Sequence, residues 1–301
     1  REEYHCEKIK AIWEYNDVDD IKNDSIKNGS KVQSTESAKL EVILNKMFFL
    51  EKDIEGEVDF IRQVMTRGLE TQERVGLHAS AMIVSDNKFC VRQQVLSLLF
   101  KQLQGEQIPV KLKRIFEEGN AIHEKWQRLF IRAGYAKAKT LDRTRFDDDY
   151  KISYTPDIVC RIPEFFDGAM IVEVKSVNPI QFRKMTSHPT AHNQLEFYMN
   201  ECIKEAKRKG KWNGKDYTKG FVLCDDKGGQ DFKIFVYDFE KETVAPFIDR
   251  CEAVKFHYNK FIGENKMVAR NEKCTSYNCK MAEKCPMKDA CWNRGMGRIR
   301  L

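Results

Sequence analysis

Ala169-Met-Ile-Val-Glu-Val-Lys-Ser-Val177 is an apolar stretch of strand length near the middle of the 301-residue chain. Its apolar side chains fall on both faces of the predicted strand, because neighbouring residues of a strand point to opposite sides. A strand of this kind lies in the middle of a sheet that helices cover. The stretch therefore predicts an α/β domain in which residues 169–177 form a central strand.

The elements predicted around this strand complete a mixed sheet flanked by helices. Apolar residues recur at helical or strand spacing through most of the chain. In chain order, we predict helices at about 85–99 and 111–133, and then two strands around the acidic turn 147–149 that end in the segment YTPDIVCRI. After the central strand we predict a helix at about 190–209, a hairpin of 220–225 and 232–238, and a helix at about 244–266. This order is typical of an α/β domain with a mixed central sheet.

The first two helices have a predicted start and a predicted buried face. Ser85 is the expected N-cap of the first, with Asp86 in its first turn. In the second, helical spacing places five apolar residues on one buried stripe. These are Ile115, Ile122, Trp126, Leu129 and Phe130.

The chain is predicted to contain three regions. Residues 1–77 form an N-terminal region of unassigned role, with helical character at 39–69 and a polar linker composition at 22–38. Residues 78–270 form the main domain, and residues 271–301 form a cysteine-rich tail. We find no stretch near the ~20 apolar residues of a membrane span and no secretory signal, and therefore expect a cytoplasmic protein.

Two opposite charges interrupt the central strand. Glu173 and Lys175 are two residues apart, so their side chains point to the same face. Burying two charges is costly unless they pair with each other or bind a ligand. Pro156-Asp157 precedes the central strand and supplies a second carboxylate. Two carboxylates suit Mg²⁺ or Mn²⁺, and sites of this composition use the bound ion to assist phosphodiester hydrolysis. The alternative for Glu173 and Lys175 is a structural ion pair.

These residues resemble the PD-(D/E)XK nuclease superfamily, whose motif matches Pro156-Asp157 and Glu173-Val-Lys175. Two more segments resemble its RecB-like branch. Gly119-Asn-Ala-Ile-His123 matches a G-x-x-x-H signature on the helix before the first strand, and Gln194-Leu-Glu-Phe-Tyr198 matches Q-x-x-x-Y on the helix after the central strand. The resemblance implies a restriction-endonuclease-like core.

The resemblance also implies roles for single residues. His123, Asp157 and Glu173 are expected to bind Mg²⁺ or Mn²⁺ together with the Val174 carbonyl, and Lys175 is expected to be the catalytic lysine. Gln194 and Tyr198 are expected to position the DNA backbone or this lysine.

Four of the ten cysteines, Cys274, Cys279, Cys285 and Cys291, fall close together in the tail. Without a secretory signal such a cluster favours metal binding over disulfides. A zinc ribbon normally has cysteine pairs two residues apart, and these spacings are longer. A soft metal centre is therefore expected, with a local zinc site of these four residues as the alternative.

RecB-like nucleases of the AddAB type and related CRISPR-adaptation exonucleases carry an iron–sulfur cluster with one cysteine ahead of the core and three after it. Ser85, Cys90 and Arg92 resemble the upstream signature S-x-x-x-x-C-x-R, and Cys285 and Cys291 match the final C-x5-C. The family's remaining cysteine would fall at position 282, which is Ala here. The resemblance implies a [4Fe–4S] cluster on Cys90, Cys279, Cys285 and Cys291, with Cys274 as the substitute ligand.

The function that follows is a metal-dependent DNA exonuclease acting on single strands or DNA ends in recombination, repair or replication. Residues 81–301 hold 40 basic and 29 acidic side chains, a surplus that suits a phosphate backbone. The absence of a G-x-x-x-x-G-K-[ST] loop excludes a built-in P-loop helicase, so a helicase or recombination protein is a possible partner. Alternatives are a structure-specific endonuclease and a non-catalytic DNA-binding subunit. By family analogy the setting is a prokaryotic or phage-infected cell, and Arg92 joins Gln194 and Tyr198 as a candidate DNA contact.

Overall fold

The computed structural model describes residues 35–67, 76–100, 110–141, 143–229 and 231–292. The chain separates into residues 1–35 and 36–301, and the description concerns the second unit. Most of the predicted linker at 22–38 lies outside the described residues, and its last residues belong to helix α2 (Thr35–Met47). Helix α3 (Ile54–Arg67) follows, so the segment predicted to be helical at 39–69 is two helices with a break.

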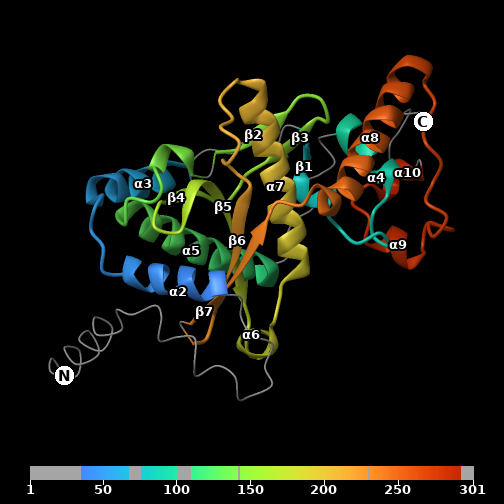
Figure 1. Cartoon of the computed structure of the whole chain (residues 1–301). Coiled ribbons are helices and arrows are strands. Elements are labelled where there is room, and N and C mark those ends of the chain that lie inside the picture. The colour runs from blue at the N-terminus through green and yellow to red at the C-terminus, as the bar shows by residue number, and fades with distance from the viewer. Residues whose placement is uncertain (1–34, 68–75, 101–109, 142, 230, 293–301) are drawn as a thin grey trace. The chain divides into compact units, whose positions relative to one another are not determined.

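A four-stranded mixed sheet forms the centre of the unit (Figure 1). Its strands stand in the order β4 (Ile158–Ile162), β5 (Phe166–Val177), β6 (Lys219–Asp226) and β7 (Phe232–Asp238). The β5–β6 pair is parallel, and the two outer pairs are antiparallel. The predicted mixed sheet, the central position of residues 169–177 and the hairpin of β6 and β7 are all confirmed.

Helices cover both faces of this sheet. Val172 and Val174 of β5 pack with Trp126 and Phe130 of helix α5 (Val110–Arg132). On the opposite face, Ile171 packs in a second core cluster with residues of helix α7 (Pro189–Arg208). Odd-numbered residues of β5 therefore face α7, and this alternation places Glu173 and Lys175 on the α7 side.

The segment YTPDIVCRI does not form one strand, which corrects the prediction. Tyr154 ends β3 (Ile152–Tyr154), which lies in a second sheet between β1 (Leu77–His78) and β2 (Arg145–Asp147), while β4 begins at Ile158. Pro156 has no N–H to donate to a neighbouring strand. The Val174 N–H donates to the Asp157 carboxylate at 2.8 Å, so a side chain replaces strand pairing at this point.

Two predictions about helix limits and faces are wrong. Helix α4 (Val91–Leu99) has Cys90 as its N-cap, and the Ser85 hydroxyl instead donates to Asn87 within a preceding turn. In α5, Trp126, Leu129 and Phe130 are buried as expected, but Ile115 is 45% exposed. Gly119 already lies beside Ser176 near the end of β5, so the turn that carries Ile115 projects past the strand.

Most of the remaining elements lie on the α7 side of the sheet, and the turn at Ala138–Thr140 packs on the α5 side. The remaining elements are helix α6 (Pro179–Lys184), helix α8 (Lys241–Glu264), the short tail helices α9 (Lys280–Glu283) and α10 (Lys288–Cys291), and two 3₁₀ turns at Ala79–Ala81 and Ala138–Thr140. Leu96 of α4 packs with Met287, Ala290 and Cys291, which joins the tail to α4 (Figure 1). Within the described residues, no helix has both the length and the apolar character needed to cross a membrane.

Candidate functional site

Asp157 is held in place by groups from two elements. The Val174 N–H donates to Oδ2 at 2.8 Å, and the Gln127 amide donates to the main-chain carbonyl at 2.9 Å. The other carboxylate oxygen, Oδ1, lies 3.3 Å from His123 Nδ1. No sequence motif predicted Gln127, but it lies four residues after His123 and therefore one turn along the same face of α5.

His123 and Asp157 are brought together as the motif predicts. Burial by itself lowers the pKa of His123, but the hydrogen bond and charge of Asp157, with the charge of Glu173, raise the pKa overall. A carboxylate favours the protonated imidazole because opposite charges attract over this distance. In the structure His123 therefore acts as a partner of Asp157.

Glu173 is completely buried beside Lys175. The Lys175 ammonium donates to Glu173 Oε1, while Oε2 is buried and meets no hydrogen-bond donor among the described residues. Burial, and then the charge of Asp157, raise the pKa of Glu173 to about 8. Burial lowers the pKa of Lys175, but the charges of Glu173 and Asp157 outweigh it and raise the pKa overall.

Gln194 and Tyr198 continue this chain of contacts along one face of α7. Gln194 Oε1 accepts from Lys175 Nζ at 3.1 Å, and Gln194 Nε2 donates to Tyr198 Oη at 2.9 Å. Lysine can only donate, so this contact fixes the orientation of the Gln194 amide. Tyr198 is 1% exposed and cannot reach a bound nucleic acid, which leaves its expected action on Lys175 through Gln194.

The donor atoms fit a hard divalent cation. Asp157 and Glu173 supply oxygens, and His123 supplies a nitrogen, the ligand types that Mg²⁺ and Mn²⁺ accept. An unpartnered buried oxygen such as Glu173 Oε2 is costly unless a ligand satisfies it. In the described part of the chain, no three His, Cys, Asp or Glu side chains are already arranged to hold a metal ion. His123 and Lys175 instead pair with the carboxylates.

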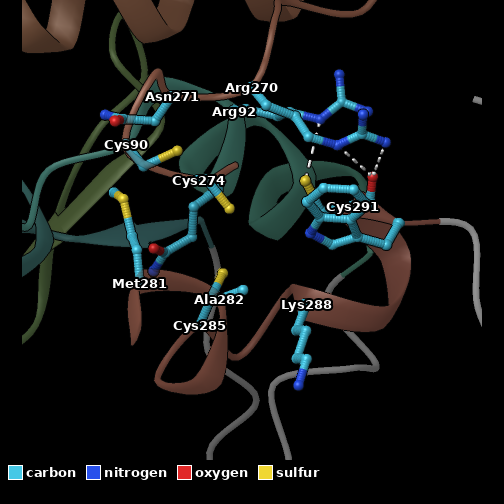
Figure 2. Close-up of a pocket in the computed structure, with 12 residues that line it drawn as sticks. Cys90, Arg92, Arg270, Asn271, Cys274, Met281, Ala282, Cys285, Lys288 and Cys291 are labelled. Carbon is cyan, nitrogen blue, oxygen red and sulfur yellow. Dashed lines mark hydrogen bonds between the residues drawn. The ribbon is translucent and has the colours of Figure 1, made fainter. Parts of the chain in front are cut away.

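Four of the predicted metal-binding cysteines line one pocket between α4 and the tail. Cys90, Cys274, Cys285 and Cys291 lie around the same space (Figure 2). Cys279 is not among the residues that line it. Its sulfur lies 3.9 Å from that of Cys274 and accepts the Ala282 N–H at 3.4 Å as the cap of α9. The structure thus brings together Cys90, Cys285 and Cys291 of the predicted ligand set, and Cys274 takes the fourth place at the pocket.

The thiols of this pocket oppose one another's ionisation. Burial raises the pKa of Cys285 to about 11, and the neighbouring Cys90, Cys274 and Cys291 add to the rise. Backbone N–H groups at the start of α9 lower the pKa of Cys279 to about 7. Four clustered sulfurs become thiolates together only when a cation offsets their charge, and soft metals prefer sulfur ligands. The residue types therefore suit a metal–thiolate centre, although among the described residues the four thiols are not already arranged to hold an ion.

Arg92 lies at this pocket and not on a DNA-binding surface, which corrects its predicted role. The side chain is 9% exposed and donates from Nε to Cys291 Sγ at 3.2 Å. Its Nη1 donates to the Val268 carbonyl at 2.5 Å.

A second polar cleft lies beside the C-terminal half of α7, with an empty volume of about 1110 Å³. Lys204 donates to Asp147 at 2.7 Å and to Glu201 at 3.2 Å. Burial and the hydrogen bond with Asp147 raise the pKa of Glu201 to about 8. Burial raises the pKa of Asp147, but hydrogen bonds with Glu201 and Lys204 outweigh this effect and lower the pKa to about 2. The two carboxyl groups thus have pKa values shifted in opposite directions, with Glu201 favouring its protonated form and Asp147 its charged form.

Glu201→Gln is expected to flatten the loss of stability that accompanies a rise in pH from about 4.5 to about 8. A carboxyl whose pKa is raised in the folded state stabilises fully below its unfolded value, and this contribution is lost as pH rises through the folded pKa of about 8. The loss is at most about 1.4 kcal/mol per pH unit. Melting temperatures of wild type and variant at pH 6 and pH 9 test this, since glutamine keeps the donor to Asp147. Equal losses in both proteins would contradict it.

Comparisons with known proteins give matches of low identity and low structural overlap. No protein-family model and no curated protein matches the chain. Among similar solved structures, SSO0001 has 12% identity and a TM-score of 0.41, covering 80% of this chain and 97% of its own. The alkaline exonuclease LHK-Exo from Laribacter hongkongensis has 12% identity and a TM-score of 0.37, covering 62% and 90%; its complex with dAMP has 11% and 0.41, covering 64% and 91%. These values are too low to assign a function.

Proposed function

We propose that this chain is a metal-dependent nuclease that hydrolyses phosphodiester bonds in DNA, acting as an exonuclease on single strands or ends. The observation that carries the proposal is the buried Glu173, whose Oε2 has no hydrogen-bond donor among the described residues and whose pKa the neighbouring Asp157 helps to raise. Asp157 and Glu173 are neighbouring carboxylates, and Lys175 donates both to Glu173 and to the Gln194 amide. This arrangement suits cation-assisted phosphate chemistry better than a structural ion pair.

Asp157, Glu173 and His123, with the Val174 carbonyl, would hold Mg²⁺ or Mn²⁺. When bound, the ion would activate a water and offset the charge that develops on the phosphate. The N–H of Val174 and the amide of Gln127 keep the Asp157 carboxylate in place without competing for Oδ1. Binding requires Lys175 and His123 to release the carboxylates with which they pair.

Lys175 would then orient the attacking water and offset negative charge on the reacting phosphate. Its ammonium group carries three protons, of which Glu173 and Gln194 each accept one in the structure. Tyr198 restrains Gln194 from within the core, so helix α7 still holds the lysine after it has released Glu173. Such restraint favours catalysis because the ammonium group of Lys175 needs little reorganisation during the reaction.

Exposed apolar residues next to the site support a single-stranded substrate. Phe116 is 49% exposed and Ile115 is 45% exposed. They lie seven and eight residues before His123 on α5, a spacing that puts all three on one side of the helix. Unpaired bases stack on exposed aromatic rings, whereas the bases of a duplex are not available for this contact.

Phe116→Ala is expected to weaken binding of single-stranded DNA by about tenfold, in line with ~1–3 kcal/mol for one stacked base. Duplex affinity should be unchanged. Fluorescence anisotropy with EDTA present measures binding without cleavage. Phe256→Ala is the matched control, because Phe256 is 60% exposed on α8, outside the site. Equal losses for both variants, or none for either, would contradict the proposed role of Phe116.

The tail would carry a [4Fe–4S] cluster bound by Cys90, Cys285 and Cys291, with Cys274 favoured over Cys279 because it lines the pocket. Bound metal would tie the tail to α4 through bonds that the apolar contacts of Leu96 and Met287 reinforce. A single zinc ion on Cys274, Cys279, Cys285 and Cys291 is the alternative. Metal analysis and a visible absorption spectrum of anaerobically purified protein separate the two.

Incubation with linear and circular single-stranded DNA in Mg²⁺ or Mn²⁺ tests the activity. Degradation of the linear form alone supports the proposed exonuclease. Cleavage of both forms would replace it with an endonuclease, and binding without cleavage would replace it with a non-catalytic DNA-binding subunit. Addition of a helicase or recombination protein to the same assay tests for a functional partner.

A further inference from the structure

The cysteine pocket has an unusual balance of charge. Twelve residues line it, including four cysteines and no aspartate or glutamate. Three of the twelve are basic, namely Arg92, Arg270 and Lys288 (Figure 2). With neutral thiols the lining would carry these three positive side chains and no negative one. The lining is therefore complementary to an anionic occupant.

Arg92 is the basic residue that is buried. It lies two residues after Cys90 in the first turn of α4, and its guanidinium makes the contacts with Cys291 Sγ and the Val268 carbonyl given above. No carboxylate within the described ranges lies at ion-pair distance from it. Arginine remains charged at all accessible pH values, and a buried charge without a counter-charge is costly. A neutral thiol is only a weak acceptor and does not compensate it.

Arg270 contacts the same cysteine in a different way. Its Nε and Nη2 donate to the Cys291 carbonyl at 3.3 and 2.9 Å, and its guanidinium lies 4.1 Å from the Trp292 ring centroid. The side chain is exposed, so water screens its charge. Arg270 thus holds the backbone of Cys291, whereas Arg92 reaches the sulfur.

We propose that Arg92 is the buried counter-ion of the metal–thiolate centre. Resting on the cluster proposed above, this role is to stabilise the net negative charge of four thiolates and their metal, through a hydrogen bond to the Cys291 sulfur. Hydrogen bonds and charges next to ligand sulfurs govern how tightly a centre is retained and how readily it accepts an electron. The unpaired guanidinium is explained because its counter-charge is the centre itself.

Three variants test this role in full-length protein purified without oxygen. Arg92→Gln removes the charge and keeps much of the side-chain volume, and Arg92→Lys keeps the charge but changes the hydrogen-bond geometry. Arg270→Gln is the matched control, since it removes a cation that contacts the carbonyl of the same cysteine. The readouts are metal content, the rate of metal release to a chelator, and, for iron, the reduction potential from an electrochemical titration.

Arg92→Gln is expected to release metal about 10- to 100-fold faster than wild type, the usual cost of removing a ligand's outer partner. With iron bound, its potential should become more negative, because adding an electron without the buried cation is harder. Arg92→Lys should lie between, and Arg270→Gln, whose exposed charge water screens, should change both readouts far less than Arg92→Gln. Circular dichroism confirms that each variant is folded; if Arg92→Gln is unfolded, Arg92→Lys decides.

The outcomes separate this inference from the function on which it rests. Wild-type release rates and potentials in both Arg92 variants would overturn the counter-ion role and leave the cluster standing. Equal changes in Arg92→Gln and Arg270→Gln would overturn it too, because they would show a general effect of charge. A wild-type protein that binds neither iron nor zinc would remove the cluster and the counter-ion together, while nuclease activity is measured independently.

Discussion

Replacing Lys175 with alanine is expected to lower the rate of DNA cleavage by about 10²- to 10³-fold, the usual cost of removing one group that stabilises transition-state charge. Metal binding should be retained or strengthened, because Lys175 now donates to Glu173 and competes with a cation for that carboxylate. Glu173→Gln should instead weaken metal binding, since a neutral amide replaces the carboxylate that would bind the ion. Single-turnover cleavage and calorimetric titration with Mn²⁺ distinguish the two variants.

Lys233→Ala is the matched control for this experiment. Lys233 lies on strand β7 and is also partly buried, but its ammonium donates to the main-chain carbonyls of Phe182 and Met185. It should keep the wild-type cleavage rate once its melting temperature shows that it is folded. Full activity of Lys175→Ala would exclude a catalytic role for the lysine and leave the buried ion pair as its only function.

The second large effect is expected at the cysteine pocket. Cys285→Ser should abolish metal binding and release the tail from α4, because metal bonds supply most of the free energy that folds small metal-binding segments, ~10 kcal/mol or more for structural zinc in isolated fingers. Its sulfur is one of four that line the pocket, whereas the apolar contacts of the tail involve few residues. Limited proteolysis and metal analysis report the two losses separately.

Cys274→Ser and Cys279→Ser form a matched pair within the same loop. The first should lose metal because Cys274 lines the pocket, and the second should retain it because Cys279 caps α9. Both substitutions keep a side chain that accepts hydrogen bonds, so folding of the loop is comparable. The reverse result would restore Cys279 as the ligand, in agreement with the set implied by the family resemblance.

Local pattern was enough to predict the sheet and the spacing of the acidic site. A stretch with apolar side chains on both faces is buried on both faces, which predicted that β5 is an inner strand. The two-residue period of a strand placed Glu173 and Lys175 on one face, and the four-residue spacing of Gln194 and Tyr198 placed them one turn apart on α7. Such periodicities act over a few residues and depend little on the rest of the chain.

Tertiary packing decided what depends on contacts between distant segments. Ile115 is exposed because α5 extends past the end of β5, a length relation that helical spacing does not contain. Arg92 is buried beside Cys291, which lies 199 residues later in the chain. Cys274 lines the pocket and Cys279 does not, a difference that depends on how the tail loop faces α4. Sequence determined the strands and the identity of the chemical groups through short-range geometry, and the fold determined which groups meet, because burial and charge pairing are settled between elements.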